Sequence, residues 1–455
     1  MCSTSLLNGE SIRVHPRAVH ATISKYMLAD GEHIIVDLQN SHGPYLRDAV
    51  TGREYIDFYA YFASQPIGHN HPKMRDPRFL ERISEVALHK PANADVYTTY
   101  MAEFVETFAR VAKPADMPHL FFIEGGALAV ENALKTAFDW KVRKNLAAGK
   151  GEKGTKVIHF REAFHGRSGY TLSLTNTADP RKYIYFPKFD WPRIINPKLR
   201  FPITEEVLAA TIATEAQAVA QIEEAVRANP DDIAALIIEP IQSEGGDNHF
   251  RPEFFAELRR LADEHDFMFI VDEVQTGMGA TGKMWAIEHM GVKPDIIVFG
   301  KKSQVCGIIV GPRIDEVPDN VFRVSSRINS TWGGNLVDMV RCQRYLEIIA
   351  EDGLVENAGA MGKVLLDGLV QLAKGSDLID NVRGLGMLLA FDLPDPRSRD
   401  LFRGVLLGNG LLALKCGQRS IRFRPMLDLD RATVEEALLR VEKSLYDARR
   451  NGGQL

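Results

Sequence analysis

The sequence has few cysteines and no segment that suits a membrane or a secretion signal. It contains four cysteines in 455 residues, and they stand far apart, as Cys2, Cys306, Cys342 and Cys416. This spacing is not that of a metal site, and it favours free thiols in a reducing compartment. The opening stretch MCSTSLLNGESIRVHP lacks the apolar core of a signal peptide, and no apolar run approaches membrane-spanning length. We therefore expect a cytoplasmic protein that holds no metal ion.

A block of charge of one sign is also missing. The net charge is −5, and the charged residues, 25% of the total, are spread along the chain. Without a basic stripe, the sequence offers no surface for nucleic acid. The hydrophobic share of 45% is ordinary for a soluble protein, and the length is too great for one simple domain.

Short, dense apolar runs are what the sequence does have. They are HLFFIE, KVIHF, AALIIEP, FMFIVDE, DIIVFG and GIIVG, and helix-like stretches such as EFFAELRRLADEH separate most of them. Strands buried on both faces of a mostly parallel sheet have this pattern, with helices in between. Little room for a helix remains before GIIVG, so we expect this strand to be an antiparallel addition.

The pattern changes along the chain in a way that predicts three parts. Residues 1–75 begin with a polar arm and continue with short β-like runs between Gly and Asn turns. Residues 76–335 hold the α/β rhythm of a large domain, and residues 336–455 have the mixed α and β character of a smaller one. We expect the N-terminal strands to join the small domain.

Ligands of parallel α/β sheets bind beyond the carboxyl ends of the strands. After HLFFIE, small residues at 125–127 open a helix, which suits a phosphate, although a tight turn would look the same. After FMFIV, Asp272 and Glu273 end a buried strand, where a carboxylate requires a cationic partner or serves as a structural cap.

Two more strand ends carry reactive residue types. In VFGKKSQVCG, Lys301 or Lys302 could form a Schiff base, the alternative being two solvated surface lysines. In REAFHGRSGY, Phe164, His165 and Arg167 bring an aromatic ring, an imidazole and a carboxylate-binding fork into one loop, unless they are ordinary core and surface residues. An anion cradle, a buried carboxylate, a Schiff-base lysine and a flat aromatic ring are together the requirements of pyridoxal 5′-phosphate (PLP).

Longer blocks resemble the class III PLP-dependent aminotransferases of fold type I. DEVQTGMGATGKMWAIEHMGVKPDIIVFGKK, GHNHP and GGALAVENALK match the patterns of that family. The blocks AFHGRSGYTLSLTNT, FPKFDWPRI, EPIQSEGGDNHFRPEFF and NSTWGGN are similar to its lysine ε-aminotransferase branch. The resemblance implies an α/β fold with a mostly parallel seven-stranded sheet flanked by helices, plus a smaller α+β domain, and makes residues 76–335 the PLP-binding domain.

The resemblance also implies the roles of the cofactor-binding residues. Lys301, 29 positions after Asp272, matches the Schiff-base lysine of the family, and Asp272 matches the partner of the pyridine nitrogen. The remaining matches are Gln275 at the ring hydroxyl, Phe164 and Val274 on the two ring faces, Gly126 and Ala127 at the phosphate, and Thr331 at the phosphate of the neighbouring subunit's PLP. The protein is thus expected to be a homodimer with shared active sites.

The substrates implied by the resemblance are L-lysine and 2-oxoglutarate, which a ping-pong reaction converts into 2-aminoadipate 6-semialdehyde and L-glutamate. Arg167 matches the residue that binds the α-carboxylate of lysine, and Asn329 helps to orient that end. Arg422 matches the residue that binds the α-carboxylate of glutamate or 2-oxoglutarate. Glu244 is expected to neutralise Arg422 while lysine is bound and to swing away for the dicarboxylate.

Three alternatives share these catalytic residues or the fold. An ω-aminotransferase for ornithine, 4-aminobutyrate or a diamine would use the same Lys301 and Asp272. A PLP aminomutase or decarboxylase would have no need of the Glu244 and Arg422 switch, and a binding protein without activity would not bind PLP covalently. For Lys302 we predict no catalytic role, because strand alternation would turn it away from Lys301 if the strand continues to these residues.

Overall fold

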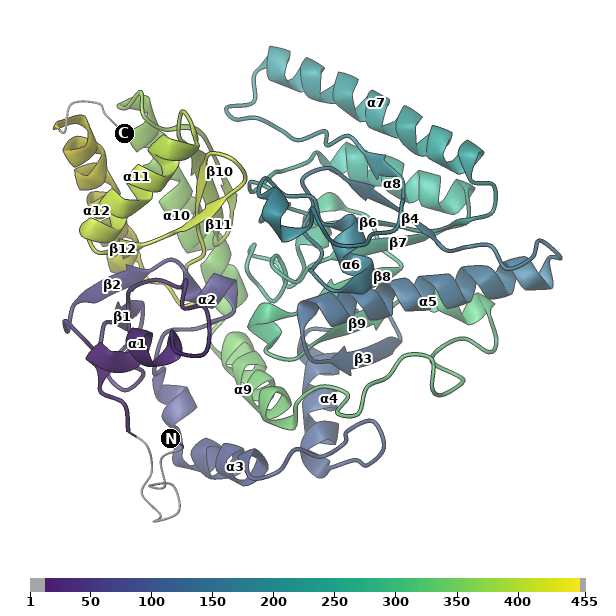
Figure 1. Ribbon diagram of the computed structural model, residues 1–455, viewed down its shortest axis with the longest axis horizontal. Helices are drawn as coiled ribbons and strands as arrows, with labels where there is room; N and C mark the ends of the chain where they lie inside the picture. Colours follow the sequence, from purple (N-terminus) through teal and green to yellow (C-terminus); the bar gives the residue numbers. More distant parts are fainter. Residues whose placement is uncertain (1–12, 451–455) are drawn as a thin grey trace.

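The structure, a computed structural model, describes residues 13–450. Its largest unit is a seven-stranded sheet (Figure 1). In spatial order its strands are β3 (His119–Ile123), β9 (Cys306–Val310), β8 (Ile296–Phe299), β7 (Met268–Asp272), β6 (Ile233–Ile238), β4 (Lys156–Phe160) and β5 (Arg193–Ile194). The neighbours from β5 to β8 are parallel, whereas β9 is antiparallel to both β8 and β3. The predicted mostly parallel sheet and its antiparallel strand at GIIVG are confirmed.

The central strands bury side chains on both faces, which explains their unbroken apolar sequences. On one face Phe269 and Val271 of β7 belong to a core cluster that includes side chains of helices α4 and α8. On the other face Met268 and Ile270 pack in a second cluster with α5. The helices around the sheet are α3 (Pro77–Ala87), α4 (Thr99–Val111), α5 (Gly126–Ala147), α6 (Gly169–Leu174), α7 (Glu205–Ala228), α8 (Pro252–Glu264) and α9 (Leu336–Glu351).

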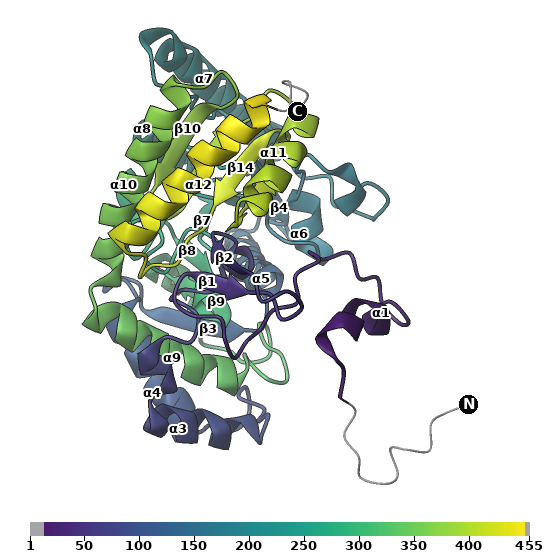
Figure 2. The same ribbon diagram turned by 90° about the vertical axis from the view of Figure 1, so that its left-hand side faces the viewer.

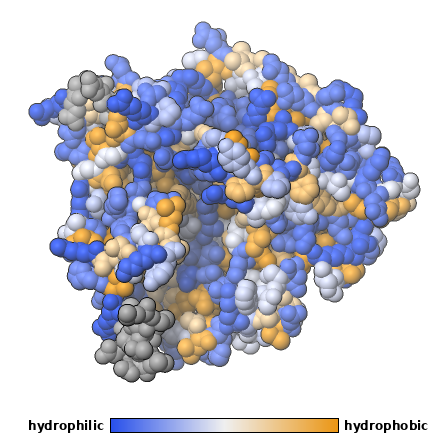
Figure 3. All heavy atoms as spheres, in the orientation of Figure 1, coloured by the Kyte–Doolittle hydropathy of each residue, from blue (hydrophilic) through white to orange (hydrophobic). Residues whose placement is uncertain are grey.

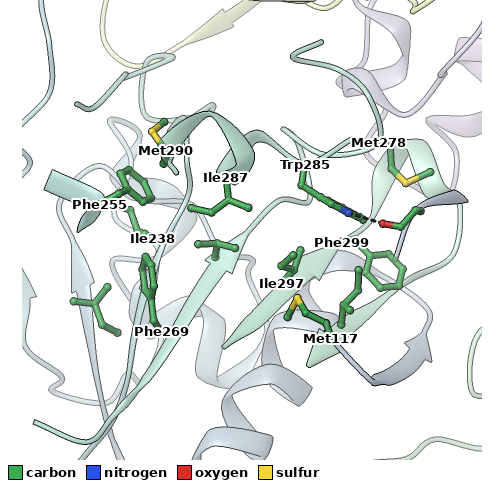
Figure 4. Close-up of a cluster of buried hydrophobic side chains, with 14 of the residues drawn as sticks. Met117, Ile238, Phe255, Phe269, Met278, Trp285, Ile287, Met290, Ile297 and Phe299 are labelled. Atoms are coloured by element: carbon green, nitrogen blue, oxygen red, sulfur yellow. Dashed lines mark hydrogen bonds between the residues drawn. The ribbon is translucent and has the colours of Figure 1, made fainter. Parts of the chain in front are cut away.

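Trp285 lies in the first of these clusters, which packs against β7 and β8. Figure 4 shows its indole beside Met278, Ile297 and Phe299. The indole Nε1 donates a hydrogen bond to the backbone carbonyl of Ala112 at 2.7 Å, so its polar atom is satisfied inside the core (Figure 4). This cluster packs against one face of β7 and β8. Asp272 is the last residue of β7, and Lys301 follows the end of β8.

A four-stranded antiparallel sheet and a three-stranded sheet make up most of the remainder. The first has the order β10 (Asp380–Leu385), β11 (Leu388–Asp392), β14 (Ser420–Phe423) and β13 (Leu414–Cys416), and the second has β1 (Tyr45–Arg47), β2 (Glu54–Asp57) and β12 (Leu411–Leu412). Helices α10 (Leu354–Lys374), α11 (Pro396–Gly408) and α12 (Arg431–Arg450) lie side by side over the larger of these sheets (Figure 2).

Both ends of the chain contribute to this second unit. Strand β2 pairs in parallel with β12, and Ile56 and Phe58 share a hydrophobic cluster with Phe391 and Phe423. The N-terminal strands therefore pack with the C-terminal part, while the boundaries at 75/76 and 335/336 stay predictions. The first twelve residues of the predicted arm lie outside the described residues.

Several short elements complete the chain. Helix α1 (Val19–Ile23) stands apart from the main body in Figure 2. The others are the four-residue segment α2 (Ala60–Ala63) and the 3-10 turns η2 (Pro16–Ala18), η3 (Pro72–Arg75), η4 (Pro180–Lys182), η5 (Ala286–Met290), η6 (Lys301–Ser303) and η7 (Pro312–Glu316). The face shown in Figure 3 is mostly hydrophilic and is recessed between the two units. Among residues 13–450, no helix is both long enough and apolar enough to cross a membrane.

Candidate active site

A cavity of about 480 Å³ lies at the carboxyl ends of the strands of the large sheet. The segments that follow β3, β4, β6, β7 and β8 all contribute to its lining, as expected for a sheet of this kind. Eight of the residues singled out from the sequence line it together: Gly126, Ala127, Phe164, Arg167, Asp272, Val274, Gln275 and Lys301. Residues spread over 176 positions of the chain thus meet in one space.

Asp272, the last residue of β7, has its carboxylate buried and held from two sides. Its Oδ1 accepts a hydrogen bond from the backbone N–H of Val274 at 3.1 Å, and its Oδ2 lies 2.8 Å from Nδ1 of His165. Nε2 of His165 has no partner among the described residues. These contacts orient the carboxylate, which lines the cavity and can meet a cationic group there.

Glu239, which the sequence analysis missed, supports the same loop. Its Oε1 accepts a hydrogen bond from the backbone N–H of Phe164 at 2.9 Å, and its Oε2 accepts one from Ser243 N–H at 3.1 Å. Burial raises the pKa of Glu239 to about 7, with a further upward contribution from Asp272 opposed by His165. The sequence did contain a signal for this residue. Glu239 directly follows the apolar run AALII, in the same way that Asp272 directly follows FMFIV.

The N-terminus of α5 opens onto the cavity without a side-chain cap. Gly125 has φ = +89°, a conformation that favours glycine, and it turns the chain from β3 into the helix. A Cβ at Gly126 would lie 3.0 Å from Cγ1 of Val274, so a larger residue would crowd the entrance of the helix. The free backbone N–H groups and the helix dipole form the anion cradle that the sequence predicted.

Neither lysine of the FGKKS stretch is an exposed surface residue, since Lys301 is half-buried and Lys302 is buried. Lys301 Nζ has no hydrogen bond or ion pair among the described residues, and the side chain lines the cavity. Burial, and then the positive charge of Arg422, lowers the pKa of Lys301 to about 8. A partly neutral amine with no partner is suited to act as a nucleophile.

Strand alternation would separate the two lysines only if the strand continued to them, and it does not. Strand β8 ends at Phe299, and Lys301 begins the turn η6 with φ = +53°. Lys302 is buried, and its Nζ is satisfied there by donating a hydrogen bond to the carbonyl of Ala63 at 3.1 Å. Burial, with Arg424 and Lys301 nearby, lowers the pKa of Lys302 to about 7.

Lys302 supports a backbone feature that the sequence did not predict. The four residues Ala60–Ala63 all have positive φ, between 43° and 67°, and form a left-handed turn. Each such residue costs roughly 1–2 kcal/mol relative to the right-handed form. Asp57 Oδ1 accepts hydrogen bonds from the N–H groups of Tyr59 and Ala60, while Gln304 Nε2 donates to the carbonyl of Ser64 at 2.8 Å. The turn places Ser64 in the lining of the cavity.

Glu244 and Arg422 form an ion pair, although neither of them is among the residues that line the cavity. Glu244 Oε2 accepts a hydrogen bond from Nη2 of Arg422 at 2.7 Å, while Nε and Nη1 of Arg422 have no partner among the described residues. Glu244 Oε1 also accepts one from Nζ of Lys182 at 2.6 Å, a partner that sequence reasoning missed. Burial raises the pKa of Glu244, but Arg422 and Lys182 more than offset this effect, so the pKa is lowered.

Asn329 and Thr331 are not brought to the cavity of their own chain. Both lie exposed in the segment before α9, and neither lines the cavity. Asn329 Oδ1 accepts a hydrogen bond from the next backbone N–H, that of Ser330, at 2.8 Å. The expected role of Thr331 concerns a neighbouring subunit, which a single chain does not include.

The donor set fits PLP. Arg167, Gln275 and Lys301 line the cavity with side chains that have no hydrogen-bond or ion-pair partner within residues 13–450. A buried carboxylate and an uncapped helix N-terminus complete the groups that a charged pyridine ring and a phosphate require. A sheet of this topology with this site defines a PLP-dependent transferase of fold type I.

Comparisons with known proteins narrow this class. The family model described as aminotransferase class-III matches residues 26–445, and the chain belongs to that family. An L-lysine-epsilon aminotransferase from Mycobacterium tuberculosis is 51% identical over 433 residues, which cover 94% of this chain and 96% of that protein. One from Streptomyces clavuligerus is 46% identical over 95% of each chain. A solved structure of the lysine aminotransferase from M. tuberculosis, 50% identical, has a TM-score of 0.93 over 95% of this chain and 100% of the other.

The two lysines predict opposite results on substitution. Lys301→Ala removes the unpartnered amine, so we expect no measurable amino transfer and no visible absorbance band from covalently held PLP. Lys302→Met keeps the length of the buried side chain and leaves Lys301 in place, so much of the activity should remain. The measurement is amino transfer to 2-oxoglutarate together with the absorbance spectrum. Activity in Lys301→Ala and its loss in a folded Lys302→Met would show that the wrong lysine was chosen.

Lys302 also predicts a pH dependence of stability. Its pKa of about 7 in the folded protein lies below the value of about 10.4 in an unfolded chain. Between these two values the unfolded chain binds a proton that the folded protein does not, so the free energy of unfolding rises with pH. The wild type should therefore gain stability relative to Lys302→Met as pH rises from about 7 to about 10, with no further change below about 7.

Urea unfolding of both proteins across this pH range measures the difference. Lys363→Met is the matched control, because the Lys363 side chain is 73% exposed and, among the residues the structure describes, pairs only with Asp367. Its free-energy difference from the wild type should stay level with pH. A level difference for Lys302→Met as well would contradict the lowered pKa.

Proposed function

We propose that the protein moves the ε-amino group of L-lysine to 2-oxoglutarate in a ping-pong reaction, with 2-aminoadipate 6-semialdehyde and L-glutamate as products. Relatives named for this amino donor, at 46% to 51% identity over nearly the whole chain, support the donor. The structural observation that carries the proposal is the pair formed by Glu244 and Arg422. A site that accepts an amine in one half-reaction and a dicarboxylate in the other needs a removable countercharge at this position.

PLP supplies, when bound, an aldehyde that condenses with amines and a ring that withdraws electrons from the reacting carbon. We assign Asp272 to the pyridine nitrogen, where its buried charge would keep that nitrogen protonated. Gln275 would hold the ring hydroxyl, and Phe164 and Val274 would confine the ring. The backbone N–H groups of Gly126 and Ala127 would hold the phosphate.

Lys301 is assigned two tasks. It holds the cofactor covalently, and its Nζ accepts a proton from the ε-carbon of lysine and returns it later in the half-reaction. A pKa of about 8 allows the amine to take up and release a proton near neutral pH. The half-buried position of Lys301 limits competing proton exchange with solvent.

Arg167 is assigned to the α-carboxylate of lysine. Its guanidinium lines the cavity, has no partner among the described residues and can bind a carboxylate with two parallel hydrogen bonds. The ε-amine would then point toward Lys301. While lysine is bound, Glu244 neutralises Arg422, which would otherwise attract a carboxylate to the amine end of the site. In the second half-reaction Arg422 would bind the α-carboxylate of 2-oxoglutarate.

We further propose a homodimer with shared active sites and a cytoplasmic location. The exposure of Thr331 outside its own cavity supports a role at the phosphate of the cofactor in a partner subunit, and Asn329 in the same segment would help to orient the substrate carboxylate. The described cysteines Cys306, Cys342 and Cys416 are free buried thiols, which is consistent with a reducing compartment.

A panel of amino donors tests the proposed substrate. With 2-oxoglutarate as acceptor, L-lysine should have the highest kcat/KM among L-lysine, L-ornithine, 4-aminobutyrate and short diamines. The assignment to lysine fails if L-ornithine or 4-aminobutyrate exceeds L-lysine about tenfold, which corresponds to about 1.4 kcal/mol in the transition state. Failure of the protein to develop visible absorbance with added PLP would exclude an aminotransferase altogether.

Removal of Glu244 tests the switch. Glu244→Ala leaves Arg422 without its countercharge, so the lysine half-reaction should slow by at least about tenfold while glutamate turnover is kept. Single-turnover spectra with each donor separate the two half-reactions. Glu244→Gln is the matched variant, since it preserves the shape and removes only the charge. Equal losses with lysine and glutamate would contradict the switch.

A further inference from the structure

Lys182 contacts two residues of the site from a turn that lies outside it. It is the last residue of η4, in the segment that joins α6 to β5, and Asp179 Oδ1 caps this turn by accepting a hydrogen bond from Arg181 N–H at 3.2 Å. The Lys182 Nζ lies 2.6 Å from Glu244 Oε1 and 5.8 Å from the centroid of the Phe164 ring. One cation therefore spans the carboxylate of the proposed switch and the aromatic ring assigned to the cofactor.

Glu244 is shared between an inner and an outer cation. The inner one, Arg422, has a side chain that is 2% exposed and lies in strand β14, which pairs on both sides. The outer one, Lys182, is 24% exposed, and Glu244 itself is 21% exposed. Since Arg422 is held by the sheet and the other two residues lie in loops, a separation of Glu244 from Arg422 is most easily made by movement of Glu244 toward Lys182.

This arrangement lowers the cost of opening the switch. A carboxylate that leaves its only cation inside a protein loses most of its charge compensation. With Lys182 in place, Glu244 keeps one cation after it leaves Arg422, and its carboxylate is then no longer shared between two cations. The freed donors of Arg422 become available to a substrate carboxylate at the same time.

We propose that Lys182 is a positioning residue that sets the specificity of the site. It holds Glu244 when Glu244 leaves Arg422, and so lets one cavity alternate between an ω-amine and a dicarboxylate. This inference rests on the proposed function and adds to it a residue that acts through Glu244 without touching substrate.

Lys182→Met tests the inference in the holoenzyme, with each half-reaction measured separately. The variant leaves Glu244 with Arg422 alone, so the dicarboxylate should compete less well. We expect the KM for 2-oxoglutarate to rise about three- to tenfold, the range of a partly buried ion pair, with kcat and the lysine half-reaction changed by less than about twofold. Lys182→Arg keeps the charge and should restore most of the affinity.

Two controls separate this role from a structural one. Arg181→Met alters the same turn, but the Arg181 side chain is 88% exposed and its one ion-pair partner in the described part of the chain is Asp179, so both half-reactions should stay unchanged. In a Glu244→Ala background, Lys182→Met should have no further effect on the KM for 2-oxoglutarate, because its partner is gone.

An equal loss in both half-reactions, an effect that persists without Glu244, or no change in the KM would overturn the inference. These outcomes differ from failure of the proposed function. If the wild type prefers another ω-amine, the lysine assignment fails, and the same split between amine and dicarboxylate is then measured with that amine as donor.

Discussion

The buried carboxylate of Asp272 is the interaction around which the site is built. It ends a strand whose neighbours are apolar on both faces, so its charge has to be satisfied by groups that come from elsewhere in the fold. His165 meets it from the loop after β4, and Glu239 holds that loop by the backbone of Phe164. The arrangement ties the ends of β4, β6 and β7 into one edge. It also leaves the carboxylate facing the cavity, where PLP needs a negative charge.

Burial of charge recurs throughout the site and gives each charged group a task. Lys301 has no hydrogen-bond or ion-pair partner within residues 13–450, and its pKa is lowered, which suits a nucleophile. Lys302, next to it, is more deeply buried and donates a hydrogen bond to the carbonyl of Ala63. Glu244 has two cations, one in the sheet and one in a surface turn. The hydrogen-bond and ion-pair partners of each group therefore distinguish the reactive Lys301 from the structural Lys302 and from Glu244, the movable countercharge.

Much of this could be predicted from sequence because strands and strand ends leave local patterns. The dense apolar runs predicted a mostly parallel sheet, the family resemblance implied its seven strands, and the small residues after HLFFIE suggested a phosphate site before α5. Lys301 and Asp272 could be paired by their spacing once the family resemblance was noticed. The alternation argument for Lys302 required the strand to continue, and it does not apply because the chain leaves the strand at Phe299. The left-handed turn at Ala60–Ala63 had no signal, since none of its residues is Gly or Asn.

The sequence by itself determined the sheet, the order of its elements and the residue types that reach its carboxyl edge. Hydrophobic periodicity and turn chemistry act over a few residues, so they can be read without a structure. Only the tertiary structure decided which charges meet. Lys182 and Glu244 are 62 positions apart, and Glu244 and Arg422 are 178 apart. Contacts across such distances depend on how the two units pack, and the environment of each buried lysine depends on them in turn.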